Sequence, residues 1–174
     1  AIPSKRGIIY DRNGKKLAVS ATAYILYGRP AQIKEKEATA KILSEVLQMD
    51  EQTVLKKISD NKSNVLIKQK VDSEKANELR EKLLANKLAG IEFVDDCKRF
   101  YPQANFASHL LGFTNNDNTG QDGVEAAFDK YLNGFPGRNI VMTDGHGDEL
   151  PGSDRKYFEP QDGLNLVLTV DEVI

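Results

Sequence analysis

The sequence is poor in the residues that build metal centres and disulfides. Its 174 residues include one cysteine, Cys97, and two histidines, His109 and His146. One cysteine excludes an internal disulfide and a Cys-rich zinc site, and the two histidines form no spacing typical of a metal site. No apolar run approaches the roughly 20 residues of a transmembrane helix, and no signal peptide is present. We therefore expect no metal, no cofactor and no membrane span in these residues.

Acidic residues are scarce at the start of the chain and abundant at its end. Residues 1–33 hold six Lys/Arg and one acidic residue, whereas residues 91–174 hold six Lys/Arg and fifteen acidic residues, within a net charge of −2. Opposite charges at the two ends favour attraction within the fold, and a mostly acidic surface would repel phosphate, so nucleic acid is not an expected partner. The composition, 40% hydrophobic and 29% charged, is that of one ordinary domain or two small lobes.

Residues 6–18, RGIIYDRNGKKLA, predict a tight β-hairpin. Asn13-Gly14 between two apolar runs is a strong signal for a two-residue turn in which both central residues have positive φ. Arg6, Asp11 and Arg12 crowd this hairpin, and on spacing alone they are ordinary solvated charges.

The segment between residues 20 and 98 predicts a small α/β lobe in the order strand, two helices, strand, helix, strand. The strand at residues 23–28 alternates Ala23, Ile25 and Tyr27 on one face. Apolar stripes at helical spacing follow, and Asp50 and Asp72 are each predicted to cap the start of a helix. The remaining strands are expected at residues 65–71 and 91–94.

Beyond residue 102, Gly, Asn and Asp become frequent and turns dominate. We expect short helices at 106–111 and 123–132, strands at 139–143 and 164–170, and a turn at 144–148. The predicted fold class is α+β, with an extended β-rich platform formed by residues 1–19 and 99–174 and an inserted α/β head lobe formed by residues 20–98. The opening hairpin is expected to pair with the platform, because its edge strands need partners.

Several short blocks follow one another in a specific order. They are the hairpin at 6–18, Arg99-Phe100-Tyr101-Pro102, the glycine-rich GFTNNDNTGQDGVE at 112–125, Leu132-Gly134-Phe135-Pro136-Gly137 and DGLNLVLTVDEVI at 162–174. This series resembles the N-terminal, non-catalytic pedestal or dimerisation region of class B penicillin-binding proteins. The positions that match its motifs are Arg6, Gly7, Asp11, Arg12, Gly14, Arg99, Tyr101, Pro102, Gly120, Gly123 and Glu125.

The resemblance implies a function for the chain and a place in the cell. Such a pedestal positions a peptidoglycan D,D-transpeptidase domain, which is expected after residue 174, and docks cell-wall proteins including a membrane peptidoglycan glycosyltransferase. It lies on the extracytoplasmic face of the bacterial membrane, and the membrane is reached only through an anchor expected before residue 1. The start Ala1-Ile2-Pro3, without methionine, agrees with a fragment of a protein of the division or sporulation type.

Glu125 is the residue predicted to unite these blocks. It lies near the start of a short helix, where an acid is tolerated, and we expect it to accept hydrogen bonds from Arg6, Arg12 or Arg99 in a buried ion network between the lobes. The alternative is an exposed acid that contributes well under about 1 kcal/mol.

Two serines match the S-x-x-K string of a transpeptidase nucleophile. Ser59 is followed by Asp60, Asn61 and Lys62, and Ser153 lies in a polar turn, but no K-T-G element is present. A serine acyl-transferase is therefore the disfavoured alternative, because nucleophile, base and oxyanion hole must converge. A free-standing extracytoplasmic interaction domain is a third possibility.

Overall fold

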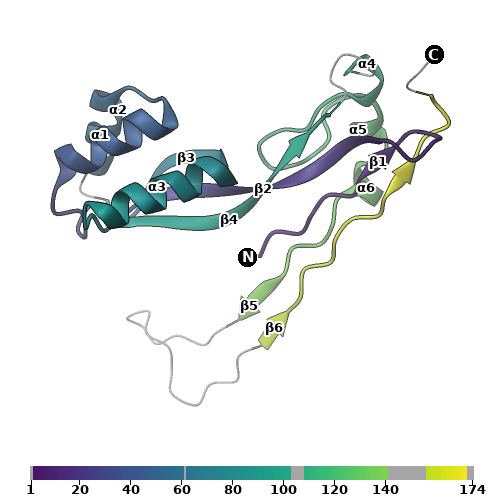
Figure 1. Cartoon of the computed structure of the whole chain (residues 1–174). Helices are drawn as coiled ribbons and strands as arrows, with labels where there is room; N and C mark the ends of the chain where they lie inside the picture. The colour runs from purple at the N-terminus through teal and green to yellow at the C-terminus, as the bar shows by residue number, and fades with distance from the viewer. Residues whose placement is uncertain (1, 61, 103–107, 141–155, 172–174) are drawn as a thin grey trace. The chain divides into compact units, whose positions relative to one another are not determined.

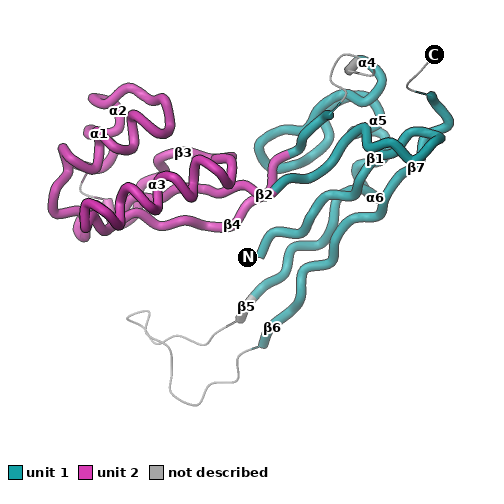
Figure 2. The backbone as a smooth tube through the Cα atoms, in the orientation of Figure 1, with its two compact units in different colours: residues 1–21, 99–174 teal, residues 22–98 magenta. Residues whose placement is uncertain are grey.

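The computed structural model describes residues 2–60, 62–102, 108–140 and 156–171 (Figure 1). The chain divides into two compact units, shown in teal and magenta in Figure 2. Unit 1 comprises residues 1–21 and 99–174, and unit 2 comprises residues 22–98. The head lobe predicted from the sequence, residues 20–98, begins two residues before unit 2.

Unit 2 follows the predicted order of strands and helices. Its helices are α1 (Lys36–Leu47), α2 (Glu51–Ile58) and α3 (Ser73–Ala85), and its strands belong to β2 (Lys16–Gly28), β3 (Val65–Asp72) and β4 (Ile91–Phe100). Strands β3 and β4 both pair with β2, and β3 is antiparallel to it. The chain enters unit 2 within β2 and leaves it within β4, which extends six residues beyond the strand predicted at 91–94.

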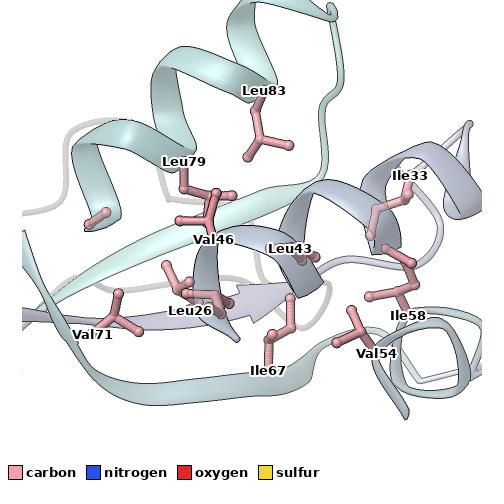
Figure 3. Packing of buried hydrophobic residues seen from close by; sticks show 13 residues of the cluster. Leu26, Ile33, Leu43, Val46, Val54, Ile58, Ile67, Val71, Leu79 and Leu83 are labelled. Atoms are coloured by element: carbon pink, nitrogen blue, oxygen red, sulfur yellow. The ribbon is translucent and has the colours of Figure 1, made fainter. Parts of the chain in front are cut away.

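The core of unit 2 forms where the apolar stripes of its helices face the sheet (Figure 3). Buried residues come from every helix and from β2 and β3, namely Leu43, Val46, Val54, Ile58, Leu79, Leu83, Leu26, Ile67 and Val71. Complete burial of such a side chain contributes about 1.5–3 kcal/mol. This core explains why stripes at helical spacing identified the lobe from the sequence.

One of the two predicted helix caps is present. The Asp50 side chain accepts hydrogen bonds from the amide of Thr53 at 2.8 Å and from its hydroxyl at 2.7 Å, and the hydroxyl bond followed by the amide bond lowers the pKa of Asp50. The prediction for Asp72 is wrong in its detail. Asp72 precedes α3, but its side chain makes no cap bond and instead accepts from Lys98 Nζ at 3.0 Å.

The predicted face of the second strand is also wrong. Ala23 and Leu26 are fully buried, three residues apart, whereas strict alternation places Ile25 and Tyr27 on the face of Ala23. The register between β2 and β3 shifts on both sides of Leu26, and such an irregularity changes which residues point inward. Alternation alone does not reveal this shift.

Unit 1 is built from short elements joined by extended segments. Its strands are β1 (Ile9–Tyr10), β5 (Arg138–Ile140), β6 (Lys156–Phe158), β7 (Leu166–Val167) and the first part of β2, and its helices are α4 (Ser108–Leu111), α5 (Gly123–Ala127) and α6 (Asp129–Leu132). β1 is antiparallel to β2 and parallel to β7, and β5 is antiparallel to β6. The hairpin thus pairs with a later strand, as predicted.

The hairpin turn is longer than predicted. Gly14 has φ +82°, but Asn13 is not among the residues with positive φ. The Gly14 amide donates to the Asp11 carbonyl, and Asp11 Oδ1 accepts from the amides of Asn13 and Lys15, both at 2.8 Å. Asp11 therefore caps a turn in which one glycine takes the left-handed conformation.

The strand predicted at 164–170 is shorter in the structure, where β7 covers only two residues, Leu166 and Val167. Leu166, Leu168 and Val170 pack on a small core formed by Ile9, Leu17, Ala18, Leu111 and Leu132, whereas Leu164 is 66% exposed. The predicted helix at 123–132 is divided into α5 and α6. The turn predicted at 144–148, with His146, and also Ser153, lie outside the described residues.

Candidate functional site

Glu125 lies in the short helix α5, which the surrounding loop holds in place. Asp122 precedes the helix, and its side chain accepts from the Gly123 amide at 2.8 Å. Gly123 has φ +58°, a conformation that residues with a side chain rarely adopt. The Gly120 amide donates to Asp129 Oδ1 at 2.7 Å and joins the loop to α6. These glycines hold the loop close to the helix that carries Glu125.

Two arginines from distant parts of the sequence meet the Glu125 carboxylate. Arg6 Nε lies 2.7 Å from Glu125 Oε2, and Arg99 Nε lies 2.7 Å from Glu125 Oε1. The side chain of Arg6 is 1% exposed, that of Arg99 is 2% exposed and that of Glu125 is 0% exposed. Each carboxylate oxygen thus has its own guanidinium, and the arrangement joins segments 119 and 26 residues apart in the sequence.

Most of the remaining guanidinium nitrogens also have partners on several segments, except Arg99 Nη2, which is buried without a hydrogen-bond partner among the described residues. Arg6 Nη1 lies 2.6 Å from Asp129 Oδ1, and Arg6 Nη2 donates to the Glu125 carbonyl at 2.8 Å. Arg99 Nη1 donates to the Gly7 carbonyl at 2.7 Å. With two guanidinium groups and two carboxylates, the cluster is electrically balanced, which offsets the cost of removing charges from water.

Tyr101 completes the cluster on one side. Its hydroxyl lies 3.4 Å from Glu125 Oε1. Burial, and after it the negative charge of Glu125, raise the pKa of Tyr101, against the opposite effect of Arg99. The phenol is therefore held in its neutral form as a donor toward the carboxylate.

The other motif residues occupy different places. Of the three arginines predicted as possible partners of Glu125, Arg6 and Arg99 contact it, whereas Arg12 is exposed and its backbone amide donates to the Val170 carbonyl. Asp11 and Gly14 build the hairpin turn. Pro102 is exposed on a groove of about 640 Å³ that it shares with Lys5, Lys16, Phe100 and Asn165.

Gly7 marks a close approach of two backbone segments. A Cβ atom at Gly7 would overlap the carbonyl oxygen of Leu164. Beside this contact, Asp162 Oδ1 accepts from the Lys5 amide and Asn165 Oδ1 accepts from the Ile8 amide, both at 2.8 Å. The side chains of residues 162 and 165 therefore fasten the first segment to the last.

Sequence reasoning missed the roles of Asp129, Asp162 and Asn165. Asp162 and Asn165 lie in the last motif block, at either end of Asp-Gly-Leu-Asn, and polar side chains around a glycine are a signal for such backbone contacts. Asp129 follows Glu125 by four residues, a spacing that places two acids on one side of a helix, yet a break separates α5 and α6 here.

The network does not join two lobes. All of its residues, Arg6, Arg99, Tyr101, Glu125 and Asp129, belong to unit 1. The sequence prediction described it as a network between lobes, although all of its predicted members lie in the platform ranges 1–19 and 99–174. Within unit 1 the cluster ties together the hairpin strand, the end of β4 and the helices α5 and α6.

The described residues contain few features of an active site. Ser59 is exposed at the end of α2, where its amide donates to the Leu55 carbonyl. His109 is exposed on α4. Over the described ranges, no group of three or more His, Cys, Asp or Glu side chains is placed to hold a metal ion, and no helix has the length and apolar character to cross a bilayer.

The fold and the buried cluster together define a class of protein. It is a β-rich platform with an inserted α/β unit, in which two arginines and one glutamate join three of the motif blocks found in the sequence. The family model described as the Penicillin-binding Protein dimerisation domain matches residues 1–168. The chain belongs to the penicillin-binding protein dimerisation domain family.

Curated relatives and a solved structure agree with this assignment. Stage V sporulation protein D of Bacillus subtilis is 38% identical over 98% of this chain and 26% of its own length. The probable peptidoglycan D,D-transpeptidase PenA of Neisseria gonorrhoeae is 33% identical over 100% of this chain and 30% of its own length. The complex between penicillin-binding protein PBP2 and MreC from Helicobacter pylori contains the same fold, with a TM-score of 0.69 and 23% identity over 99% of this chain and 36% of that chain.

The chain spans less than a third of the curated relatives described here. The comparisons thus establish the family and the fold of this segment only. The named activity, peptidoglycan D,D-transpeptidation, is that of a relative more than three times as long.

Proposed function

We propose that the chain is the non-catalytic pedestal of a class B penicillin-binding protein. It would hold a peptidoglycan D,D-transpeptidase domain that follows it and would act on the extracytoplasmic face of a membrane-anchored parent protein. Family membership supports this proposal, as does the name of the PenA relative. The sequence features that define a penicillin-sensitive serine site are incomplete in the chain, since no K-T-G element is present.

The buried cluster is the observation that carries the proposal. Both oxygens of Glu125 are occupied by guanidinium groups, and the three side chains are almost completely buried. Such a carboxylate cannot reach a substrate and cannot serve as a general base. The Glu125 carboxylate instead holds three parts of the chain together: the N-terminal segment through Arg6, the end of β4 through Arg99, and α5. A rigid support requires such a fixed point.

Unit 2 is the part that we assign to partner contacts. It has its own core, and it contains none of the residues of the cluster, because the chain enters it within β2 and leaves it within β4. The Helicobacter pylori protein of the same fold is in complex with MreC, which supports a cell-wall protein as the class of partner. A membrane peptidoglycan glycosyltransferase is a second partner of this class.

The experiment uses the longer protein that carries this chain, with Glu125→Ala compared with the exposed change Glu92→Ala. We expect both variants to be acylated by penicillin at the unchanged rate in detergent, because neither residue touches the catalytic serine. In cells, Glu125→Ala is expected to lower the fraction of cross-linked wall peptides at equal protein level, whereas Glu92→Ala leaves it unchanged.

Two results would contradict this function. A parallel loss of acylation in Glu125→Ala would place Glu125 in the catalytic machinery. Normal cross-linking by a well-expressed Glu125→Ala protein would show that the cluster is not needed to position the catalytic domain.

A further inference from the structure

Two ion pairs cross between β3 and β4 in unit 2. Lys70 Nζ on β3 lies 3.0 Å from Asp96 Oδ1 on β4, and Lys98 Nζ on β4 lies 3.0 Å from Asp72 Oδ1 on β3. Each strand supplies one lysine and one aspartate, two residues apart. Since both strands pair with β2, the two pairs add a direct connection between them.

The inner pair is shielded and the outer pair is open to solvent. The side chains of Lys70 and Asp96 are 15% and 11% exposed, whereas those of Lys98 and Asp72 are 45% and 56% exposed. An exposed ion pair contributes little to stability and is weakened by salt, whereas a shielded ion pair is screened less by salt. The two pairs are therefore expected to respond differently to ionic strength.

The inner pair surrounds the backbone of Cys97. Lys70 Nζ donates to the Cys97 carbonyl at 2.7 Å, and Asp96 Oδ1 accepts from the Cys97 amide at 2.8 Å. Lys70 has φ +55°, which is unusual for a residue with a side chain in the interior of a strand. Such a conformation persists where surrounding contacts determine it, and these bonds supply the contacts.

Cys97 lies between Asp96 and Lys98 on β4, so its side chain points to the opposite face of the strand from theirs. It is the single cysteine of the chain and is 6% exposed. Two residues further along β4 is Arg99, the first residue of the second part of unit 1 and a member of the buried cluster. The crossed pairs therefore act on the last residues of β4 within unit 2.

We propose that the crossed pairs Lys70–Asp96 and Lys98–Asp72 form a latch that holds residues 96–98 of β4 to β3 and thereby keeps the Cys97 thiol buried. Opening of this latch exposes the Cys97 thiol without unfolding of the core of unit 2, because local openings require less free energy than global unfolding. Residues 96–98 of β4 thus open before the core of unit 2. This inference does not depend on the function proposed above.

The test measures the reaction of Cys97 with the thiol reagent DTNB in the folded 174-residue chain, where the thiolate attacks the reagent disulfide and releases thionitrobenzoate. Lys70→Met removes the inner pair, and we expect it to raise the reaction rate roughly tenfold or more. Lys68→Met is the matched control. Lys68 lies on the same strand, and its Nζ donates to the Leu47 carbonyl at 2.8 Å, so this change removes the same charge and a similar hydrogen bond.

Each measured rate of Cys97 labelling is compared with the rate expected if Cys97 reacted only in globally unfolded molecules. The fraction of unfolded molecules is taken from urea unfolding of the same variant. If Lys70→Met and Lys68→Met react at the same rate after this comparison, Cys97 is exposed by global unfolding and the latch does not exist. The proposal also fails if the rate in the unaltered chain follows the global unfolding free energy at every urea concentration.

Lys98→Met provides a second test that depends only on an exposed side chain and preserves the fold. Added salt is expected to speed the reaction of the unaltered chain by screening the Lys98–Asp72 pair, and to have a smaller effect on Lys98→Met. An equal salt effect on both proteins would overturn the proposed role of the outer pair.

Discussion

Glu125→Ala is the substitution that tests the buried cluster most severely. It removes the carboxylate that accepts from Arg6 Nε and Arg99 Nε, both at 2.7 Å, and leaves two guanidinium groups in a site that is almost closed to solvent. Removal of one partner of a buried ion pair costs about 3–5 kcal/mol. Because a whole domain has a stability of about 5–15 kcal/mol, we expect unit 1 to lose a large part of its free energy of unfolding.

A double-mutant cycle separates the interaction from the effects of the individual side chains. Arg99→Ala alone is expected to cost a similar amount, but it should cost less in the Glu125→Ala background, where its partner is already absent. The expected interaction energy is about 1–3 kcal/mol. Because the chain has no tryptophan, the assay is amide hydrogen exchange by NMR, which reports on the residues of each unit separately.

The control is an ion pair in solvent. Arg29 Nη2 lies 2.7 Å from Glu92 Oε2, with side chains 46% and 39% exposed, so Glu92→Ala should cost no more than about 1 kcal/mol. Additive losses for Glu125→Ala and Arg99→Ala would refute the cluster as an energetic unit. A loss for Glu125→Ala no larger than that for Glu92→Ala would refute the assigned burial cost.

Three further outcomes follow from the geometry. Gly7→Ala should destabilise unit 1 by at least about 1–3 kcal/mol, because its Cβ overlaps a backbone carbonyl, whereas Gly14→Ala, with no atom within 4 Å of its Cβ, should cost only about 1 kcal/mol from its positive φ; equal losses in urea unfolding would contradict this difference. Since the pKa of Tyr101 is raised, its contribution to stability should be complete below the ordinary value of 10.0 and should be lost as the pH rises through the folded-state pKa; Tyr101→Phe should abolish that loss in an alkaline unfolding series. Since the pKa of Asp50 is lowered, its contribution should be present above the ordinary value of 3.8 and should be lost as the pH falls through the folded-state pKa; if Asp50→Asn has the same acid profile, its bonds with Thr53 do not stabilise α2.

Much of unit 2 can be predicted from the sequence because its core is built from local patterns. Leu43, Leu79 and their neighbours lie at helical spacing, and this period survives in the fold because one face of each helix is buried. The strand face around Leu26 cannot be predicted in this way, because the shift in register depends on the pairing of β2 with β3. Asp72 was assigned to the wrong bond because its partner Lys98 is 26 residues away.

Unit 1 is harder to predict because its contacts are distant in sequence. The motif blocks identified Arg6, Arg99 and Glu125, but neither spacing nor periodicity showed that Arg6 and Arg99 share Glu125 whereas Arg12 lies on the surface. The hairpin turn was misjudged because the signal of Asn13-Gly14 fits turns of several lengths, and the Asp11 side chain determines which one forms.

The most direct test of the account compares two proteins in one experiment with fluorescent penicillin. One is the 174-residue chain, and the other is the longer protein proposed to carry it. The account predicts a stable covalent label on the longer protein and none on the chain, because the proposed pedestal would support a separate catalytic domain that carries the reactive serine. A stable label on the chain that disappears in Ser59→Ala or Ser153→Ala would contradict the account, as would a longer protein that takes no label.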